Sequence, residues 1–464
     1  MSQSIPGPNS LPVQIKLREL ARSAGMPFQD LLPAELIEQA LAAETVWCRE
    51  CVYTPEVTLQ TFLWQVLGAD HSCRDSVAQL MATRIQEGRS VPSPATDPYC
   101  KARQRLPEEV CARLMREVGK RLHGSEAEFG RLAGRPVKLV DGSTLSMPDT
   151  PENQAVYPQM KSQTPGVGFP IMRIVAMLSL GTAAVVDLAM GPYAGKQTGE
   201  TALFRTMWDS LSPGDIVAGD RYFASFWDLA LLQQRGVDSV YRQHQLRPVD
   251  FRRGKRLGPD DHLLFWKKPQ RPRWMDEETY RQIDDELVVR EVRIRVRRRG
   301  WRVRELVLIT TLIDDTLVSR EELADVYLAR WQAEVDLRSI KTTMQMDVLR
   351  CKTPEMVRKE IWMHLLAYNL IRTVMAQAAR LHGLAPRAIS FKGALQTLNA
   401  FRTTYRIACG TARERVLALL YATIASHIVG DRPGRFEPRA VKRRPKSHAL
   451  LTVPRHVARR RLTT

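Results

Sequence analysis

The spacing of hydrophobic residues changes along the chain. From about residue 15 to residue 130 apolar positions recur at helical spacing, as in LQTFLWQVL at residues 59–67, and strand signals are few. Short apolar runs typical of strands follow at residues 137–141, 171–188 and 215–220, separated by helical patterns. Strands mixed with helices indicate an α/β core. We therefore expect an all-helical N-terminal domain followed by an α/β domain.

The segment from about residue 245 to residue 312 differs from the rest of the α/β region. Residues 286–297 alternate polar and apolar positions, as a half-exposed antiparallel strand does, and a second run follows at residues 303–311. We expect a β-rich insertion here. Its arginines form either a solvated strand edge or, as we favour, a track along a DNA backbone. They are Arg290, Arg293, Arg295, Arg297, Arg298 and Arg299.

Two helices are predicted after this insertion. Ser319 and Glu322 have the spacing of a capping box, so a helix should begin there and continue to about residue 344. A second helix should begin at Pro354 and end near Gly383. The boundaries predicted for the whole chain are a disordered leader 1–14, a helical DNA-binding domain 15–132, a catalytic α/β domain 133–385, and a helical segment with a basic tail 386–464.

The charge of the chain narrows its function. Lys and Arg number 69 against 50 Asp and Glu, a formal net charge of +19 over 464 residues, which favours a polyanionic partner such as nucleic acid. A basic enzyme of another kind is the alternative. The seven cysteines are not paired by spacing, which fits a reducing cytoplasm. The most apolar stretch, residues 174–186, is too short to cross a bilayer, so no membrane association is expected.

Acidic residues supply the candidate chemistry. Asp141 and Asp220 each follow a predicted strand, although either one could simply be a turn residue. Tyr327, Arg330 and Glu334 lie with Lys341 on one stripe of the helix after Ser319, and Arg338 lies near it. A solvated charged face would explain this stripe. It also suits a phosphodiester, with the Glu binding a metal ion, the cations holding phosphates and the Tyr hydroxyl donating a hydrogen bond.

The same residues carry a resemblance to a known family. Tyr327, Arg330, Glu334 and Lys341, with two, three and six residues between them, are similar to the Y-R-E-K signature of bacterial insertion-sequence transposases of the insertion-sequence-4 family. DGST at residues 141–144 and GDRYF at 219–223 resemble the first two acidic motifs of that family, and the long gap before Glu334 matches its β-strand insertion. The resemblance covers roughly residues 45 to 460.

The resemblance implies a ribonuclease-H-like catalytic core that uses two Mg²⁺ or Mn²⁺ ions. Asp141, Asp220 and Glu334 would be the metal ligands, in keeping with the preference of these ions for oxygen ligands. The other residues of the stripe, together with Arg338, would contact double-stranded DNA. Such an enzyme binds the ends of a mobile element, cleaves them and joins the 3′ ends to target DNA.

Further expectations follow from this function. Two ends must be held together, so we expect a homodimer on DNA, in the cytoplasm and associated with the bacterial nucleoid. The alternatives are a metal-dependent ribonuclease-H-like nuclease without strand transfer and a DNA-binding derivative without catalysis.

This sequence differs from the family pattern at one position of the β-strand insertion. Relatives carry a Trp directly before the last strand of the insertion, where it stacks on a flipped-out base. Leu306 stands at that position here, and the nearest candidate is Trp301, with Trp266 and Trp274 as weaker ones. The cleavage route, including any hairpin intermediate, is therefore left open.

Two other motifs are set aside. Cys48, Cys51, His71 and Cys73 suggest a zinc site, but the one-residue spacing of the second pair is unusually tight. Residues 191–197 differ from a phosphate-binding loop because they are one residue short and end in Gln, so ATP is not implied.

Overall fold

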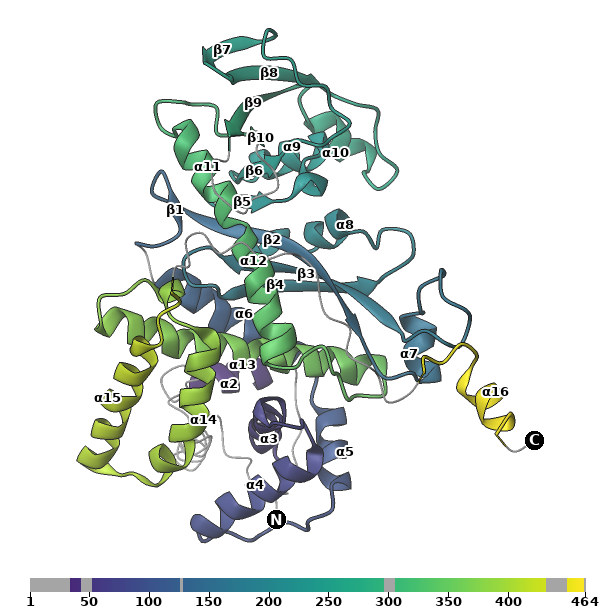
Figure 1. Ribbon diagram of the computed structural model, residues 1–464, viewed down its shortest axis with the longest axis vertical. Helices are drawn as coiled ribbons and strands as arrows, with labels where there is room; N and C mark the ends of the chain where they lie inside the picture. The colour runs from purple at the N-terminus through teal and green to yellow at the C-terminus, as the bar shows by residue number, and fades with distance from the viewer. Residues whose placement is uncertain (1–33, 43–51, 126–127, 296–304, 431–448, 463–464) are drawn as a thin grey trace, which may run out of the picture.

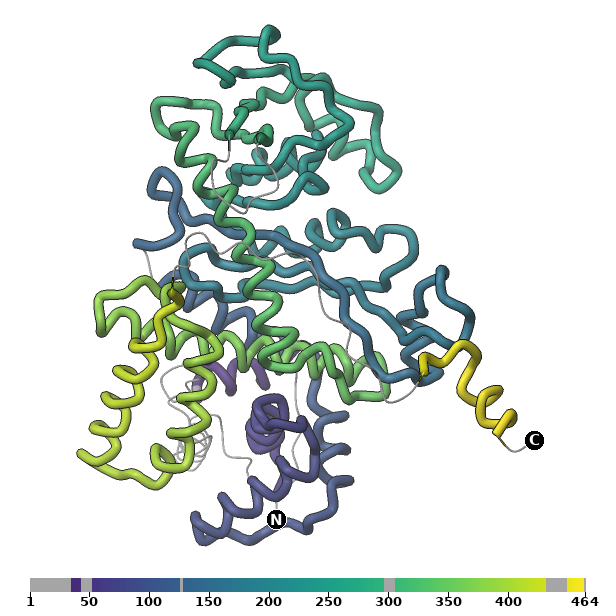
Figure 2. The backbone as a smooth tube through the Cα atoms, viewed as in Figure 1, coloured from purple at the N-terminus to yellow at the C-terminus, as the bar shows by residue number. Residues whose placement is uncertain are grey.

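A mixed β-sheet with helices packed on both of its faces forms the centre of the computed structural model (Figures 1 and 2). The structure describes residues 34–42, 52–125, 128–295, 305–430 and 449–462. Some predictions lie outside the described residues: the leader 1–14, Cys48 and Cys51, Arg297, Arg298, Arg299 and Trp301.

The first half of the sheet comes from residues 135–242. The strands β2 (Arg135–Ser146), β3 (Ile171–Ser179) and β4 (Val185–Pro192) form an antiparallel meander. On the other side of β2 lie β5 (Ile216–Gly219), parallel to β2, and β6 (Asp238–Arg242), parallel to β5. β3 and β4 are mostly buried, which explains their long apolar runs. The α/β class expected from the sequence is confirmed.

The β-rich segment continues this same sheet. β10 (Glu305–Thr310) pairs antiparallel with β6, followed by β9 (Glu286–Arg295), β8 (Asp261–Lys267) and β7 (Lys255–Gly258). The short helix α10 (Glu277–Gln282) lies between β8 and β9 in the sequence. Figure 1 shows these strands at the end of the molecule farthest from the N-terminal helices.

The arginines of β9 differ in exposure, and only Arg293 and Arg295 alternate with buried residues as predicted. Arg290 is buried, and its Nη2 lies 2.6 Å from Oδ2 of Asp261. Arg293 and Arg295 both pair with Asp260. β8 and β10 cover the two edges of β9, so its polar positions meet carboxylates of neighbouring segments. The buried Arg290 is therefore not part of a DNA track, whereas the interpretation stays a prediction for Arg293 and for Arg295, whose side chain is 62% exposed.

Helices at both ends of the chain share a core with the sheet. Buried side chains of α2, α3 and α6 belong to the same hydrophobic cluster as β2, β3 and the long helix α13 (Pro354–Leu381). A second cluster on the other face joins the sheet to α8 and α9. Helices are thus present where the N-terminal pattern predicted them, but a separate N-terminal domain is not confirmed.

The remaining elements are α2 (Ala34–Ala42), α3 (Pro55–Leu67), α4 (Cys73–Gln86), α5 (Asp97–Arg105), α6 (Glu108–Ser125), β1 (Arg131–Leu132), α7 (Pro151–Val156), α8 (Glu200–Arg205), α9 (Phe226–Gln234), α14 (Phe391–Ile407), α15 (Gly410–Ser426) and α16 (Arg455–Arg460).

The helical region after residue 319 contains two helices that meet at Arg330. The first is α11 (Arg320–Ala329), which begins with the predicted capping box between Ser319 and Glu322. The second is α12 (Trp331–Arg338), which passes into a π-helical turn over residues 339–343. None of the helices in the described ranges combines the length and hydrophobicity that a membrane span requires.

Candidate active site

Two aspartates lie side by side on neighbouring strands. β5 pairs with β2 only as far as Leu139 opposite Ala218, and Asp141 and Asp220 each lie two residues beyond that pair. Adjacent strands are about 4.8 Å apart, so the two carboxylates are neighbours. Asp220 follows β5 directly, as predicted, and its Oδ1 accepts a hydrogen bond of 2.8 Å from the backbone N–H of Tyr222.

The predicted strand end at Asp141 is wrong. β2 continues through Ser146 because its later residues pair with β3 after β5 has ended. Asp141 therefore lies in the middle of β2, opposite Ala176 of β3. It borders the opening that the short β5 leaves in the sheet.

The third acid, Glu334, is connected to Asp141 through a guanidinium group. Arg330 lies at the junction of α11 and α12, and its Nη1 is 3.7 Å from Oδ1 of Asp141. Its Nη2 is 3.3 Å from Oε1 of Glu334, one helical turn later. Glu334 is exposed, so its side chain has room to reorient toward Asp141. The arrangement brings two of the three predicted acids around one cation.

The electrostatics of the site favour positive charge. Burial raises the pKa of Asp141 to about 6, Arg330 opposes the rise, and the charges of Glu334 and Asp220 add to it. A carboxyl group with a raised pKa is one whose negative charge is incompletely compensated. A cation of higher charge than one guanidinium would therefore be bound favourably here.

Lys341 extends from the π-helical turn to the strand that carries Asp141. Its Nζ donates hydrogen bonds to Oγ of Ser143 at 3.0 Å and to the carbonyl oxygen of Thr144 at 2.8 Å. The amino group therefore lies beside β2, two to three residues beyond Asp141. These contacts attach the end of the helical stripe to the sheet.

The other members of the stripe differ in exposure. Tyr327 is buried in α11, and the guanidinium carbon of Arg330 lies 5.9 Å from its ring centre. Burial raises the pKa of Tyr327, while Arg330 and then Arg242 lower it, so Arg242 of β6 is also near the site. Sequence reasoning missed Arg242 because no motif contains it. Arg338 is exposed on α12.

A buried carboxylate fixes α12 beside the sheet. Oδ1 of Asp336 accepts a hydrogen bond of 3.0 Å from Nη2 of Arg372, in α13. Oδ2 accepts one of 2.9 Å from Nη2 of Arg387. Asp336 lies two residues after Glu334, so these ion pairs determine where the third acid is presented.

Two of the weaker tryptophan candidates pack within the protein. Trp266 is buried, and the guanidinium carbon of Arg247 lies 3.6 Å from its ring centre. Trp274 is stacked in the same manner by Arg205 at 3.7 Å. Both rings thus already make a cation–π contact within the protein.

The donor set fits a hard divalent ion, although its groups are not already gathered around a metal position. Within the described ranges, no cluster of three or more His, Cys, Asp or Glu side chains is arranged to hold a metal ion. Instead, the guanidinium of Arg330 lies between Asp141 and Glu334. Carboxylate oxygens are the ligands that Mg²⁺ and Mn²⁺ prefer. Burial raises the pKa of Asp141, so a cation bound beside it would stabilise its ionised form.

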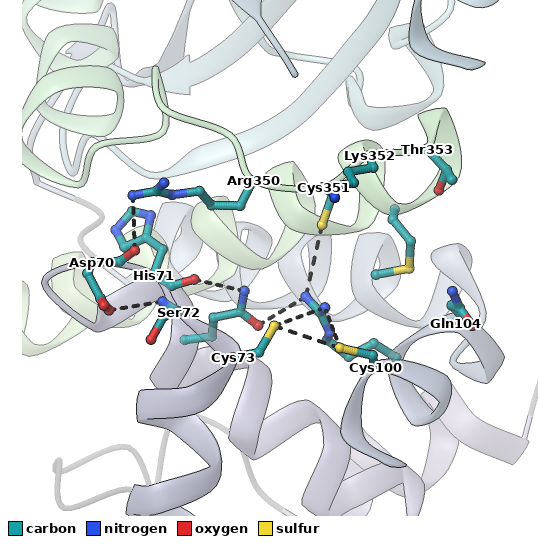
Figure 3. Close-up of a pocket in the computed structure, with 13 residues that line it drawn as sticks. Asp70, His71, Ser72, Cys73, Cys100, Gln104, Arg350, Cys351, Lys352 and Thr353 are labelled. Carbon is teal, nitrogen blue, oxygen red and sulfur yellow. Dashed lines mark hydrogen bonds between the residues drawn. The ribbon is translucent and has the colours of Figure 1, made fainter. Parts of the chain in front are cut away.

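A separate cavity of about 460 Å³ lies between the N-terminal helices and the start of α13 (Figure 3). Nη2 of Arg103 contacts Sγ of Cys73 at 3.3 Å and Sγ of Cys100 at 3.6 Å, and its Nη1 lies 3.9 Å from Sγ of Cys351. The guanidinium of Arg103 thus lies among these three thiols. None of the three predicted acids lines this cavity.

Comparison with known proteins identifies the family. The family described as "Transposase DDE domain" matches residues 132–370, just over half of the chain and including Asp141, Asp220 and Glu334. The chain belongs to this family. It is thus a DNA transposase, an enzyme that cleaves and joins DNA, and its family depends on divalent metal ions. The resemblance to insertion-sequence-4 transposases is confirmed.

Individual relatives agree with this assignment. The chain is 27% identical to transposase InsG of insertion sequence element IS4 from Escherichia coli K12, over 90% of this chain and 91% of the relative. It is 24% identical to the putative transposase InsZ of the same organism, over 48% of this chain and 71% of the relative. Among solved structures, it matches piggyBac transposase in a synaptic complex with hairpin DNA, with a TM-score of 0.40, 10% identity, and coverage of 92% of this chain and 88% of that chain.

Proposed function

We propose that this transposase binds the ends of its own mobile element, cleaves the DNA there and joins the 3′ ends to target DNA. Asp141, Asp220 and Glu334 are its metal ligands. The observation that carries the proposal is the convergence of β2, β5 and α12, where Arg330 bridges Asp141 and Glu334 beside Asp220. The antiparallel meander β2–β3–β4, with β5 parallel to β2 and β6 parallel to β5, supports a ribonuclease-H-like core.

The acidic residues of the site are proposed to bind metal ions, and Arg330 and Tyr327 to bind DNA. Two bound Mg²⁺ or Mn²⁺ ions would supply charge compensation at the entering and leaving oxygens of the phosphodiester. The three carboxylates hold them, and Arg330, released from the carboxylates, binds a phosphate oxygen of the DNA. Tyr327 donates its hydroxyl to the same DNA strand. These roles need no general base from the protein, because the metal ions, when bound, would lower the pKa of the attacking water and then of the 3′-OH, and the released proton would pass to solvent.

Lys341 is proposed to contact a phosphate near the cleavage site. It already lies beside Asp141 through its bonds to Ser143 and Thr144, and one of these must be exchanged for a phosphate oxygen. Lys341→Ala should then lower the slope of log affinity against log salt by roughly one unit, because one fewer counterion is released. Lys120→Ala, at an exposed position of α6, is the matched control. An unchanged slope for Lys341→Ala would leave Lys341 with a purely structural role.

The DNA contacts extend beyond the acids. Arg338 is exposed on α12, next to the proposed site, and is proposed to bind backbone phosphates, with Trp301 stacking on a base. Residues 15–132 are proposed to read the element ends, and the basic tail within 386–464 to bind DNA or a partner. The active complex is a homodimer that holds both ends. Light scattering of the complex with end DNA tests this: two chains per two ends support it, and one chain bound to each separate end contradicts it.

A joining assay separates transposition from simple cleavage. The substrates are pre-cleaved ends, made from the DNA that flanks the coding region, and a supercoiled target plasmid with Mg²⁺. We expect covalent end–plasmid products that depend on a free 3′-OH. End cleavage without any joined product under the same conditions would favour a metal-dependent nuclease, and neither reaction would favour a DNA-binding derivative.

A further inference from the structure

A fourth carboxylate lies against the strand that carries Asp141. Glu200 is the first residue of α8, and its side chain fills the space next to Gly142. A Cβ added at Gly142 would lie 2.4 Å from Cδ and 2.5 Å from Oε1 of Glu200. Side chains of successive strand residues point to opposite faces, so Glu200 lies on the face of β2 opposite to the side chain of Asp141.

Asp220 is close enough to Glu200 for their charges to interact. β5 ends at Gly219, so at the level of Gly142 the sheet is open beside β2. Asp220 lies at this opening, and α8 packs against the turn that follows Asp220. Burial raises the pKa of Glu200, and the charge of Asp220 raises it further. The two carboxylates are thus neighbours across the end of β5.

The chain compensates the negative charge of Glu200 only in part. In the part of the chain that the structure describes, neither a hydrogen bond nor an ion pair is formed by the half-buried carboxyl group of Glu200. Arg173 of β3 lowers the pKa of Glu200, but its Nη1 donates to the carbonyl oxygen of Thr198 at 2.5 Å. That hydrogen bond holds Thr198, two residues before Glu200, against β3. A cation bound between the two neighbouring carboxylates would be stabilised by both of them.

We propose that Glu200 supplies a fourth carboxylate to the metal-binding site of this transposase, a role that rests on the proposed function of Asp141, Asp220 and Glu334. Asp141 and Glu334 approach the opening from one face of β2, Glu200 approaches from the other, and Asp220 follows the end of β5 beside the opening. A side chain at residue 142 would displace the carboxyl group of Glu200 from its place beside β2.

Metal binding by the full-length chain without DNA tests this directly. Free Mn²⁺ is measured by electron paramagnetic resonance during titration of the wild type and of Glu200→Gln, which keeps the shape of the side chain and removes its charge. Loss of an outer-shell partner of a metal ligand weakens metal binding by about 10- to 100-fold, so loss of a ligand should weaken Mn²⁺ binding by at least about 10-fold. Glu414→Gln, at an exposed position of α15, is the matched control and should bind like the wild type. Equal affinity of Glu200→Gln and the control would overturn the proposal.

A second pair of variants tests the proposal even if Glu200→Gln misfolds. Gly142→Ala should weaken Mn²⁺ binding in the wild type, because the new methyl group pushes the Glu200 carboxyl group away. In a Glu200→Ala background the same change should have no further effect. Equal weakening in both backgrounds would show that Gly142 acts independently of Glu200, which would also contradict the proposal.

Asp141→Asn distinguishes failure of this inference from failure of the proposed site. If Asp141→Asn loses Mn²⁺ binding while Glu200→Gln retains it, the three-acid site stands and the role of Glu200 is refuted. If Asp141→Asn binds Mn²⁺ like the wild type, the proposed site itself is wrong.

Discussion

Removing the buried carboxylate of Asp336 should release α12 from the sheet. The Asp336 side chain is almost fully buried and accepts charged hydrogen bonds from Arg372 at 3.0 Å and Arg387 at 2.9 Å. Removing one partner of a buried ion pair costs about 3–5 kcal/mol. The lower value applies, since Arg372 keeps its bond to Oη of Tyr368 and Arg387 keeps the carbonyl oxygen of Ser179. Asp336→Ala should therefore destabilise this region by about 3 kcal/mol.

Hydrogen exchange measures this loss where it occurs. At about 1.4 kcal/mol per tenfold change, ~3 kcal/mol corresponds to roughly 100-fold faster exchange of the amides of α12 if they exchange by local opening. Asp325→Ala, at an exposed position of α11, is the matched control and should exchange like the wild type. Cleavage by Asp336→Ala should fall as well, because Glu334 is no longer held in place. Exchange in α12 indistinguishable from that of Asp325→Ala would refute the anchoring role of Asp336.

Three further outcomes are expected. Asp141→Asn should raise the melting temperature of the metal-free chain at pH 8, because burying the ionised carboxylate of Asp141 destabilises the folded chain. This gain in melting temperature should fade as the pH falls from about 6 toward the ordinary pKa of 3.8. An equal gain at pH 3 would contradict this cause. The hydrogen bond with the thiol of Cys73 lowers the pKa of Cys100 to about 6. The alkylation rate of Cys100, followed by mass spectrometry, should therefore level off above about pH 7 and not continue to rise through pH 8.5. Gly119→Ala should lower the melting temperature of the chain, since the new Cβ would lie 2.1 Å from the carbonyl oxygen of Val185. In the same helix, the new Cβ of Gly124→Ala would meet nothing within 4 Å, so this change should be neutral or stabilising. Equal effects of the two changes would show that α6 does not approach β4 this closely.

The elements with local signals were predicted well. The capping box at Ser319 and the helix beginning at Pro354 follow from residues that contact one another within a few positions. The spacing of Tyr327, Arg330 and Glu334 likewise places them along one helical region, because helix geometry fixes which residues share a face.

Features that depend on distant partners were not predictable from the sequence. The length of β2 is set by its pairing with β3, so Asp141 lies in mid-strand although its own neighbourhood resembles a strand end. Arg290 is buried because Asp261, 29 residues away, meets it. Glu200 belongs to no motif of fixed spacing, and only the folding of α8 onto β2 brings it to Gly142.

The central claim is that Asp141, Asp220 and Glu334 hold the metal ions that drive DNA cleavage. It is tested most directly by comparing Asp141→Asn with Asp325→Asn, a substitution of the same kind at an exposed position of α11, on DNA that carries the element ends. Both variants should bind the ends with the affinity of the wild type. With Mg²⁺, Asp325→Asn should cleave at the wild-type rate and Asp141→Asn should give no cleavage. Cleavage by Asp141→Asn at a rate near that of Asp325→Asn would contradict the account.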